Sequence, residues 1–178
     1  MQNQFEDLDD DGVITDGDRY MTGKNPAPKF YYGINVKVTC GNLDFGLNGH
    51  GSAGVWIFND FASANSTASL DLNSGALPNQ AELVKKTGFV APNSAQQWYS
   101  DYFLENGSFF RLDDMSLGYT FRDIGQWGTD IRVAMGMQNL FILTGYSGMD
   151  PETTSEAGID NAMWPRPRTY SLRLNVKF

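Results

Sequence analysis

The last eleven residues, from Arg168 to Phe178, constrain the fold of this chain more than any other stretch. They read RTYSLRLNVKF, and from Thr169 onward polar and apolar residues alternate without exception, which predicts a strand with one apolar face and one polar face. A chain that ends on an aromatic residue in such a strand is typical of outer-membrane β-barrels, whose strands turn apolar residues to lipid and polar residues to the lumen. We therefore expect the strand to act as a membrane-assembly signal through its apolar positions, which are Tyr170, Leu172, Leu174, Val176 and Phe178.

The same alternation recurs four times earlier in the chain. It predicts strands over residues 29–39, 43–57, 108–121 and 131–142. The apolar parity slips once near Asp113 and Asp114, which indicates a β-bulge, and it changes again near Asn139. Five strands of this kind predict an all-β, antiparallel sheet.

The connections between these strands alternate in length, which separates a barrel from a sandwich. Short connections at 40–42 and 122–128 alternate with long ones at 59–107 and 144–167, the asymmetry of periplasmic turns and extracellular loops. Aromatic residues also gather at both predicted rims, as a bilayer favours. They are Phe30, Tyr32, Trp56, Phe58, Phe109, Phe110, Phe141 and Tyr170 at one rim and Phe45, Tyr119, Phe121, Trp127 and Phe178 at the other.

Five strands cannot close a transmembrane barrel, because barrels of this class have at least about eight strands and an open edge is not stable in hydrocarbon. We therefore expect residues 29–178 to be the C-terminal strands of a larger barrel. Residues 1–28 are predicted to form an acidic extracellular loop. The chain starts without the basic and apolar regions of a secretory signal, so we expect it to be the tail of a longer protein if it is not cytoplasmic.

Composition excludes several classes of function. The net charge of -8 argues against a nucleic-acid partner. The single cysteine, Cys40, cannot form an internal disulfide, and no run of about eighteen apolar residues is present that would predict a transmembrane helix. Nothing resembles a nucleophile elbow, a catalytic triad or a phosphate-binding glycine loop, so we expect no enzyme.

The acidic loop contains a pattern typical of calcium-binding loops. Oxygen ligands are expected at alternating positions, with a glycine, here Gly12, for the sharp turn. A hard cation would offset the repulsion between the clustered carboxylates, and we expect calcium rather than magnesium. The alternative is a solvated acidic loop without an ion. The expected ligands are Asp7, Asp9, Asp11, the Val13 carbonyl, Thr15 and Asp18.

Three further groups are candidates for weaker roles. His50 lies on the lumen-facing parity and is a candidate either for substrate contact or for a hydrogen bond within the wall. Asp150-Pro151-Glu152 is either a ligand or partner contact or a loop turn. Arg166 and Arg168, on either side of Pro167, are expected to anchor the loop or to pair with acidic groups.

Five segments together resemble the C-terminus of SusC/RagA-type TonB-dependent transporters of Bacteroidota. They are LDDDGVITDGDR, PAPKFYYGINV, ENGSFFRLDDMSLGYTF, MQNLFILTGYSGMDPE and WPRPRTYSLRLNVKF, and they cover most of the chain outside residues 60–95. The resemblance implies a 22-stranded barrel with an N-terminal plug in the outer membrane, inserted by the barrel-assembly machinery. It also implies import of glycans or peptides with a SusD-like surface lipoprotein, powered through TonB.

Two other functions remain open on the sequence. A soluble, calcium-binding β-sandwich that binds glycans would pack the apolar faces against one another. A porin without TonB coupling would let solutes diffuse without an energy source. The importer hypothesis requires that the apolar faces contact lipid.

Overall fold

The computed structural model describes residues 6–68, 81–90, 100–125, 128–152, 154–155 and 157–178. The chain divides into two compact units. We call Pro28–Gly54, Gly107–Gly145 and Pro165–Phe178 the sheet unit, and Met1–Ala27, Val55–Asn106 and Tyr146–Trp164 the loop unit.

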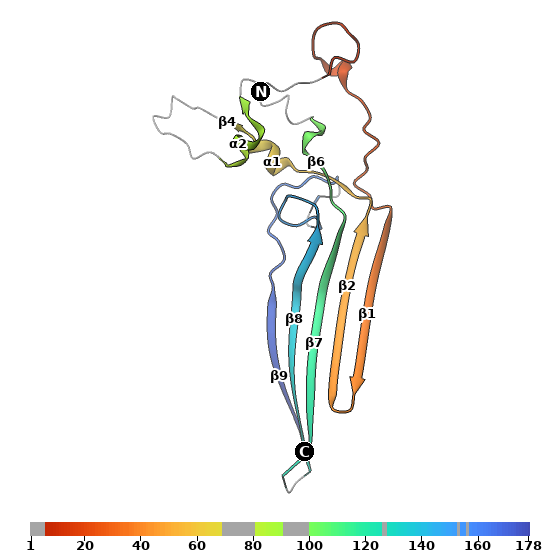
Figure 1. Ribbon diagram of the computed structural model, residues 1–178, viewed down its shortest axis with the longest axis vertical. Coiled ribbons are helices and arrows are strands. Elements are labelled where there is room, and N and C mark those ends of the chain that lie inside the picture. Colours follow the sequence, from red (N-terminus) through yellow and green to blue (C-terminus); the bar gives the residue numbers. More distant parts are fainter. Residues whose placement is uncertain (1–5, 69–80, 91–99, 126–127, 153, 156) are drawn as a thin grey trace, which may run out of the picture. The chain divides into compact units, whose positions relative to one another are not determined.

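The sheet unit is built from five antiparallel strands in the order β1-β2-β7-β8-β9, which lie side by side in Figure 1. Their bounds are Phe30–Cys40 for β1, Leu43–Ala53 for β2, Phe109–Ile124 for β7, Thr129–Thr144 for β8 and Thr169–Lys177 for β9. Each strand has 9 to 16 residues, against about 9–11 needed to cross a bilayer at a tilt. The all-β antiparallel class and the five long strands are those that the alternating pattern predicts.

The register gives the sheet one apolar and one polar face. Val36 pairs with Leu47, Leu47 with Met115, Met115 with Met137 and Met137 with Tyr170, so one apolar row crosses all five strands. Side chains on this face are widely exposed, and Leu172 and Leu174 reach 78% and 65%. The apolar faces therefore do not form the interior of a two-layered sandwich.

A β-bulge keeps the faces consistent where the sequence parity slips. Asn48 pairs with Asp114 but Gly49 pairs with Leu112, which leaves Asp113 as an extra residue relative to β2. The β7–β8 register shifts at the same height, between Leu112 and Asp114. The predicted bulge is thus confirmed, and it returns the apolar residues on either side of it to one face.

Two glycines in β2 make room for aromatic rings on the apolar face. A Cβ on Gly51 would lie 2.5 Å from the Tyr32 ring, and one on Gly49 would lie 2.8 Å from the Phe110 ring. The two rings stack over this gap with centroids 6.3 Å apart and planes 7° apart. The Tyr32 hydroxyl donates to the Phe109 carbonyl at 2.9 Å, so the aromatic rim is fixed by hydrogen bonding as well as by packing.

The second strand is shorter than the sequence predicts. The expected strand over 43–57 ends at Ala53, because Gly54 adopts a positive φ of 79° that interrupts the extended backbone. Residues 56–58 instead form β3 of the loop unit. β7 continues to Ile124 and β8 starts at Thr129, so the connection between them is shorter in sequence than the predicted 122–128.

The loop unit consists of short elements around a small core. Its strands are β3 Trp56–Phe58, β4 Thr67–Ala68, β5 Phe89–Val90 and β6 Leu104–Asn106, and its helices are η1 Asp16–Asp18, α1 Asp60–Ala64, α2 Leu83–Thr87 and η3 Asp101–Phe103. β3 pairs antiparallel with β6, and β4 pairs parallel with β5. Val55, Ile57 and Tyr146 form the buried cluster, in which Ile57 is 0% exposed.

In the described residues, we find no helix with the length and apolar character needed to span a membrane.

Candidate functional site

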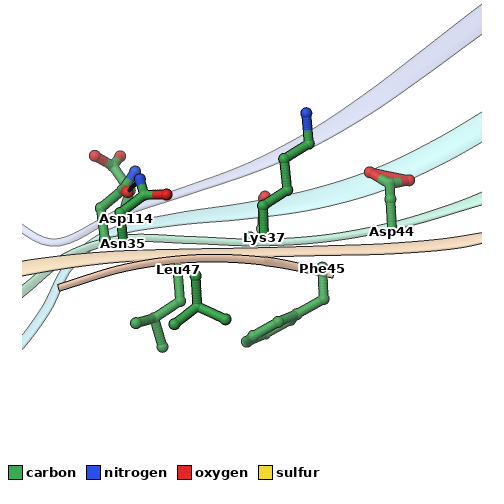
Figure 2. A pocket seen from close by; sticks show the side chains of 10 residues that line it. Asn35, Lys37, Asp44, Phe45, Leu47 and Asp114 are labelled. Carbon is green, nitrogen blue, oxygen red and sulfur yellow. Dashed lines mark hydrogen bonds between the residues drawn. The ribbon is translucent and has the colours of Figure 1, made fainter. Parts of the chain in front are cut away.

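The polar face of the sheet unit carries the charged and amide side chains of the strands. Figure 2 shows Lys37, Asp44, Asn35 and Asp114 on one side of the sheet, while Leu47 and Phe45 project from the other side. A shallow hollow of about 170 Å³ lies over β1, β2 and β7 at these residues. Charged and uncharged polar groups line it together, so this side can hydrogen-bond to polar solutes.

An ion pair crosses β7 on this face. Arg132 of β8 donates from Nε to Asp44 of β2 at 3.1 Å and also donates from Nη2 to the same carboxylate, a bidentate pair. The pair passes above Gly118, where an added Cβ would clash with Asp44 Oδ2. Gly118 therefore provides the space in which two strands that are not neighbours exchange a salt bridge.

His50 also lies on the polar face, as its sequence parity predicts. Its Nδ1 is 2.6 Å from Oδ2 of Asp113, the extra residue of the bulge, and its ring packs edge-on against Phe109 with centroids 5.6 Å apart. The bulge thus aims a carboxylate at the chain's single histidine. The parity slip located the bulge in the sequence, but the pairing of His50 with Asp113 depends on the β2–β7 register, which the sequence alone does not supply.

The acidic loop brings three of its six predicted metal ligands together. One carboxylate oxygen each of Asp7, Asp9 and Asp11 lies within 4.8 Å of the others. The carboxylates also order the turn: Asp7 accepts from the Gly12 amide at 2.7 Å, and Asp11 accepts from the Val13 amide at 2.7 Å. The Gly12 φ of 82° provides the sharp turn that the motif requires.

Two of the other predicted ligands, Asp18 and Thr15, accept hydrogen bonds from backbone amides. Asp18 accepts from the Thr15 amide at 2.7 Å and from the Leu8 amide at 2.8 Å. These amides, Thr15 first and Leu8 second, hold the pKa of the Asp18 carboxyl below its usual value. The Thr15 hydroxyl accepts from Gly17 at 3.1 Å and caps η1. Asp18 therefore closes the loop, and it does not join the other three carboxylates.

The loop unit also contains buried polar groups that the sequence did not single out. Tyr146 donates to Oδ2 of Asp160 at 2.6 Å, and these residues are 6% and 3% exposed. Burial first, and then the neighbouring carboxylate of Asp160, raises the pKa of Tyr146 above its usual value.

Asp150 is 3% exposed and accepts from the Glu152 amide at 3.0 Å, which makes Asp150-Pro151-Glu152 a hydrogen-bonded turn.

The predicted assembly residues lie on β9 and at the end of the chain. Tyr170, Leu172, Leu174 and Val176 pair with Met137, Met135, Val133 and Ile131 of β8. Phe178 is 94% exposed. Among the predicted rim residues, Tyr170 lies in the row of Met137, and Trp127 falls outside the described residues.

An uncharged apolar face that crosses five antiparallel strands, opposite a face with ion pairs and amides, is the wall of an outer-membrane type of β-barrel. SusC of Bacteroides thetaiotaomicron, a TonB-dependent receptor, is 34% identical over 186 residues that cover 100% of this chain and 18% of SusC. TonB-dependent receptor P3 of Formosa agariphila is 30% identical over 98% of this chain and 19% of its own length.

The solved structures of a RagAB peptide importer give the same fold. The chain matches the open-open state with a TM-score of 0.64 at 19% identity, over 98% of this chain and 20% of the matched chain. No family model matches. The chain is of the SusC/RagA type among TonB-dependent receptors, and it spans about a fifth of the length of the relatives that it matches.

Proposed function

We propose that the chain forms part of the barrel wall of an outer-membrane importer that takes up oligomeric nutrients, glycans or peptides, with energy supplied through TonB. The observation that supports this most is the apolar face of the sheet unit. Its residues alternate with polar ones on every strand, none of those paired across the sheet is charged, and most are exposed. In water such a face would aggregate, and in a bilayer it would meet lipid chains.

The polar face supports a role as a lumen wall in the same proposal. The Asp44–Arg132 pair and the His50–Asp113 pair both lie on it, which suits contact with hydroxyl and amide groups of a polar oligomer. Sugars and peptides both present such groups, so the wall alone is compatible with either substrate class. A SusD-like surface lipoprotein as lid, as in the family that the chain resembles, is part of this proposal.

Deletion of β9 tests the proposal in cells that produce the protein containing this chain. Without its terminal strand and Phe178, the protein should be lost from the outer membrane, measured by surface labelling and membrane fractionation. Surface levels equal to those of the unaltered protein would refute the assignment. Uptake that persists after TonB is removed would instead favour a porin.

We also propose that the acidic loop binds calcium. The convergent carboxylates of Asp7, Asp9 and Asp11 and the turn at Gly12 fit the oxygen ligands that this hard cation takes. The Val13 carbonyl and Thr15 would complete the set, and Asp18 would join it after releasing the amides of Leu8 and Thr15. A bound calcium ion would neutralise the carboxylate charge and hold the loop in one conformation.

Calorimetric titration with calcium of the detergent-solubilised protein that contains this chain tests this site. Asp9→Asn should weaken binding about tenfold, because affinity in such loops follows the number of charged ligands. Asp16→Asn is the matched control. Asp16 lies in the same loop but outside the convergent group, and it pairs with Arg19 at 2.6 Å. The calcium affinity of the Asp16→Asn variant should therefore stay unchanged. Equal loss in both variants would show a nonspecific effect of charge.

A further inference from the structure

The strand pair β8–β9 differs from the other neighbouring strands that the chain connects directly. Cys40 pairs with Leu43, three positions later, and Ile124 pairs with Thr129, five positions later, so these short connections fix the register of the strands they join. β8 and β9 are joined instead through residues 145–168. A connection of that length restrains register weakly, because its closure entropy changes little when the ends shift by one or two residues.

The pairing register of β9 determines which face and which height of the sheet each of its side chains occupies. A slip by one residue would turn Leu172 and Leu174 to the polar face and Arg173 to the apolar face. A slip by two would keep the faces but move the aromatic Tyr170 along the strand by about 7 Å, since each residue rises about 3.3 Å. Some feature other than the turn must therefore select the pairing of Gln138 with Thr169 that is observed.

Asn139 lies next to the first β8–β9 pair and contacts both flanking segments. Its side-chain nitrogen donates to the Arg166 carbonyl at 2.6 Å and lies 3.4 Å from the Pro167 carbonyl, just before β9 begins. Its side-chain oxygen accepts from Nη1 of Arg111 on β7. Arg111 is 2% exposed, so the β7 end of this connection is held firmly in the sheet.

The backbone of Asn139 explains how one side chain reaches both segments. Its φ is 51°, in the left-handed region, and it lies at the β8 position where the register with β7 shifts. Asparagine adopts this conformation more readily than most residues. Glycine would also adopt it but has no amide, and aspartate has no N–H to donate to the carbonyls. Both the backbone and the side chain at position 139 thus favour asparagine.

We propose that Asn139 is a positioning residue that sets the register of the terminal strand by binding the chain just before β9 to the bulge of β8 and β7. The same height of the sheet also holds the His50–Asp113 contact, so polar bonds run from β2 through β7 and β8 to the start of β9. The inference rests on the sheet geometry. The proposed function supplies only the membrane in which it is tested.

Disulfide trapping in the membrane-inserted protein tests the register directly. Cys40→Ser removes the native thiol, and Met135→Cys with Leu172→Cys reports the observed pairing. Met135→Cys combined with Tyr170→Cys or with Leu174→Cys reports slips by two residues. In the Asn139→Gly and Asn139→Asp backgrounds, the ratio of in-register to slipped cross-link should fall about fivefold or more, the factor that corresponds to one lost hydrogen bond. Asn175→Gly on β9 is the control and should leave the ratio unchanged.

Two results would overturn the proposal. One is an unchanged ratio in both Asn139 variants. The other applies if the Asn139 variants do not assemble. If Asn139 sets the register, the in-register disulfide should restore their assembly. Failure of that disulfide to restore assembly would assign Asn139 another role. Neither result depends on what the protein transports, and loss of import with a normal cross-link ratio would count against the proposed function alone.

Discussion

The two units of this chain differ in where their apolar side chains lie: the loop unit buries them in a core, and the sheet unit exposes them on one face. The loop unit buries Val55, Ile57 and Tyr146 together, and Tyr146 and Asp160 satisfy each other by a hydrogen bond inside it. The sheet unit leaves Leu172 and Leu174 open and keeps its charged groups on the other face. One sequence therefore follows the rule of a water-soluble core in one part and the rule of a bilayer wall in the other.

Substitution of a core residue of the loop unit should have the largest effect. Ile57→Ala removes a side chain that is 0% exposed and leaves a cavity, so it should cost about 2–5 kcal/mol. Hydrogen exchange of the Phe58 amide, which donates to the Gly158 carbonyl at 2.9 Å, measures the loss locally. Ile34→Ala on the apolar face of β1 is the matched control, and its cost should be smaller because lipid chains can fill the space. Equal costs would remove the distinction between the units.

A charge on the apolar face should have the next largest effect. Leu174→Arg places a guanidinium toward lipid and should cost about 2–4 kcal/mol if the position is near the bilayer centre. Asn175→Arg puts the same group on the polar face of the same strand, opposite Arg132, where repulsion between the two guanidiniums should cost only about 1 kcal/mol or less. Folding of the membrane-inserted protein against denaturant should report a small change for Asn175→Arg and a large one for Leu174→Arg. The opposite order would mean that the two faces have been exchanged.

The period of two in the sequence predicts the long strands of the sheet unit. It does not predict features that depend on the backbone conformation of a single residue. The alternation around Tyr170 and Val176 predicts face and pairing because each residue of a strand has only two directions. The end of β2 at Ala53 does not follow from the alternation, because the positive φ of Gly54 leaves no mark in the polar and apolar pattern. The loop unit has no period at all, so its core around Ile57 is visible only in three dimensions.

The candidate sites likewise divide into one that the sequence pattern predicts and others that depend on the three-dimensional pairing of the strands. The acidic loop is local, and its spacing alone indicated that Asp7, Asp9 and Asp11 converge. The contact of His50 with Asp113 and that of Asp44 with Arg132 join residues that are far apart in sequence and depend on register. Sequence placed all four residues on strands but contained no signal for the pairing itself.

Two tyrosine–aspartate hydrogen bonds of the loop unit have nearly the same length but differ in burial. Comparing them isolates the effect of burial on the stability that such a bond contributes. Tyr146 donates to Asp160 at 2.6 Å and is 6% exposed, whereas Tyr20 donates to Asp101 at 2.7 Å and is 60% exposed. Tyr146→Phe leaves a buried carboxylate oxygen without this donor and should cost about 1–3 kcal/mol. Tyr20→Phe exposes Asp101 to water and should cost about 0.5 kcal/mol or less. Thermal unfolding of the two variants measures the difference, and equal values would mean that burial does not decide it.

The smallest expected effect is a pH dependence of the acidic loop. The amides of Thr15 and Leu8 lower the pKa of Asp18, so the folded loop favours the ionised carboxylate. A group whose pKa is lower in the folded state contributes stability above its usual pKa and loses it as the pH falls through the lowered value. Backbone amide shifts of Leu8 and Thr15 in NMR should therefore stay constant above the usual carboxyl range and move together below it. In Asp18→Asn this joint transition should be absent, whereas Asp16→Asn should keep it, and a transition that persists without the Asp18 carboxylate would assign it to Asp7, Asp9 or Asp11.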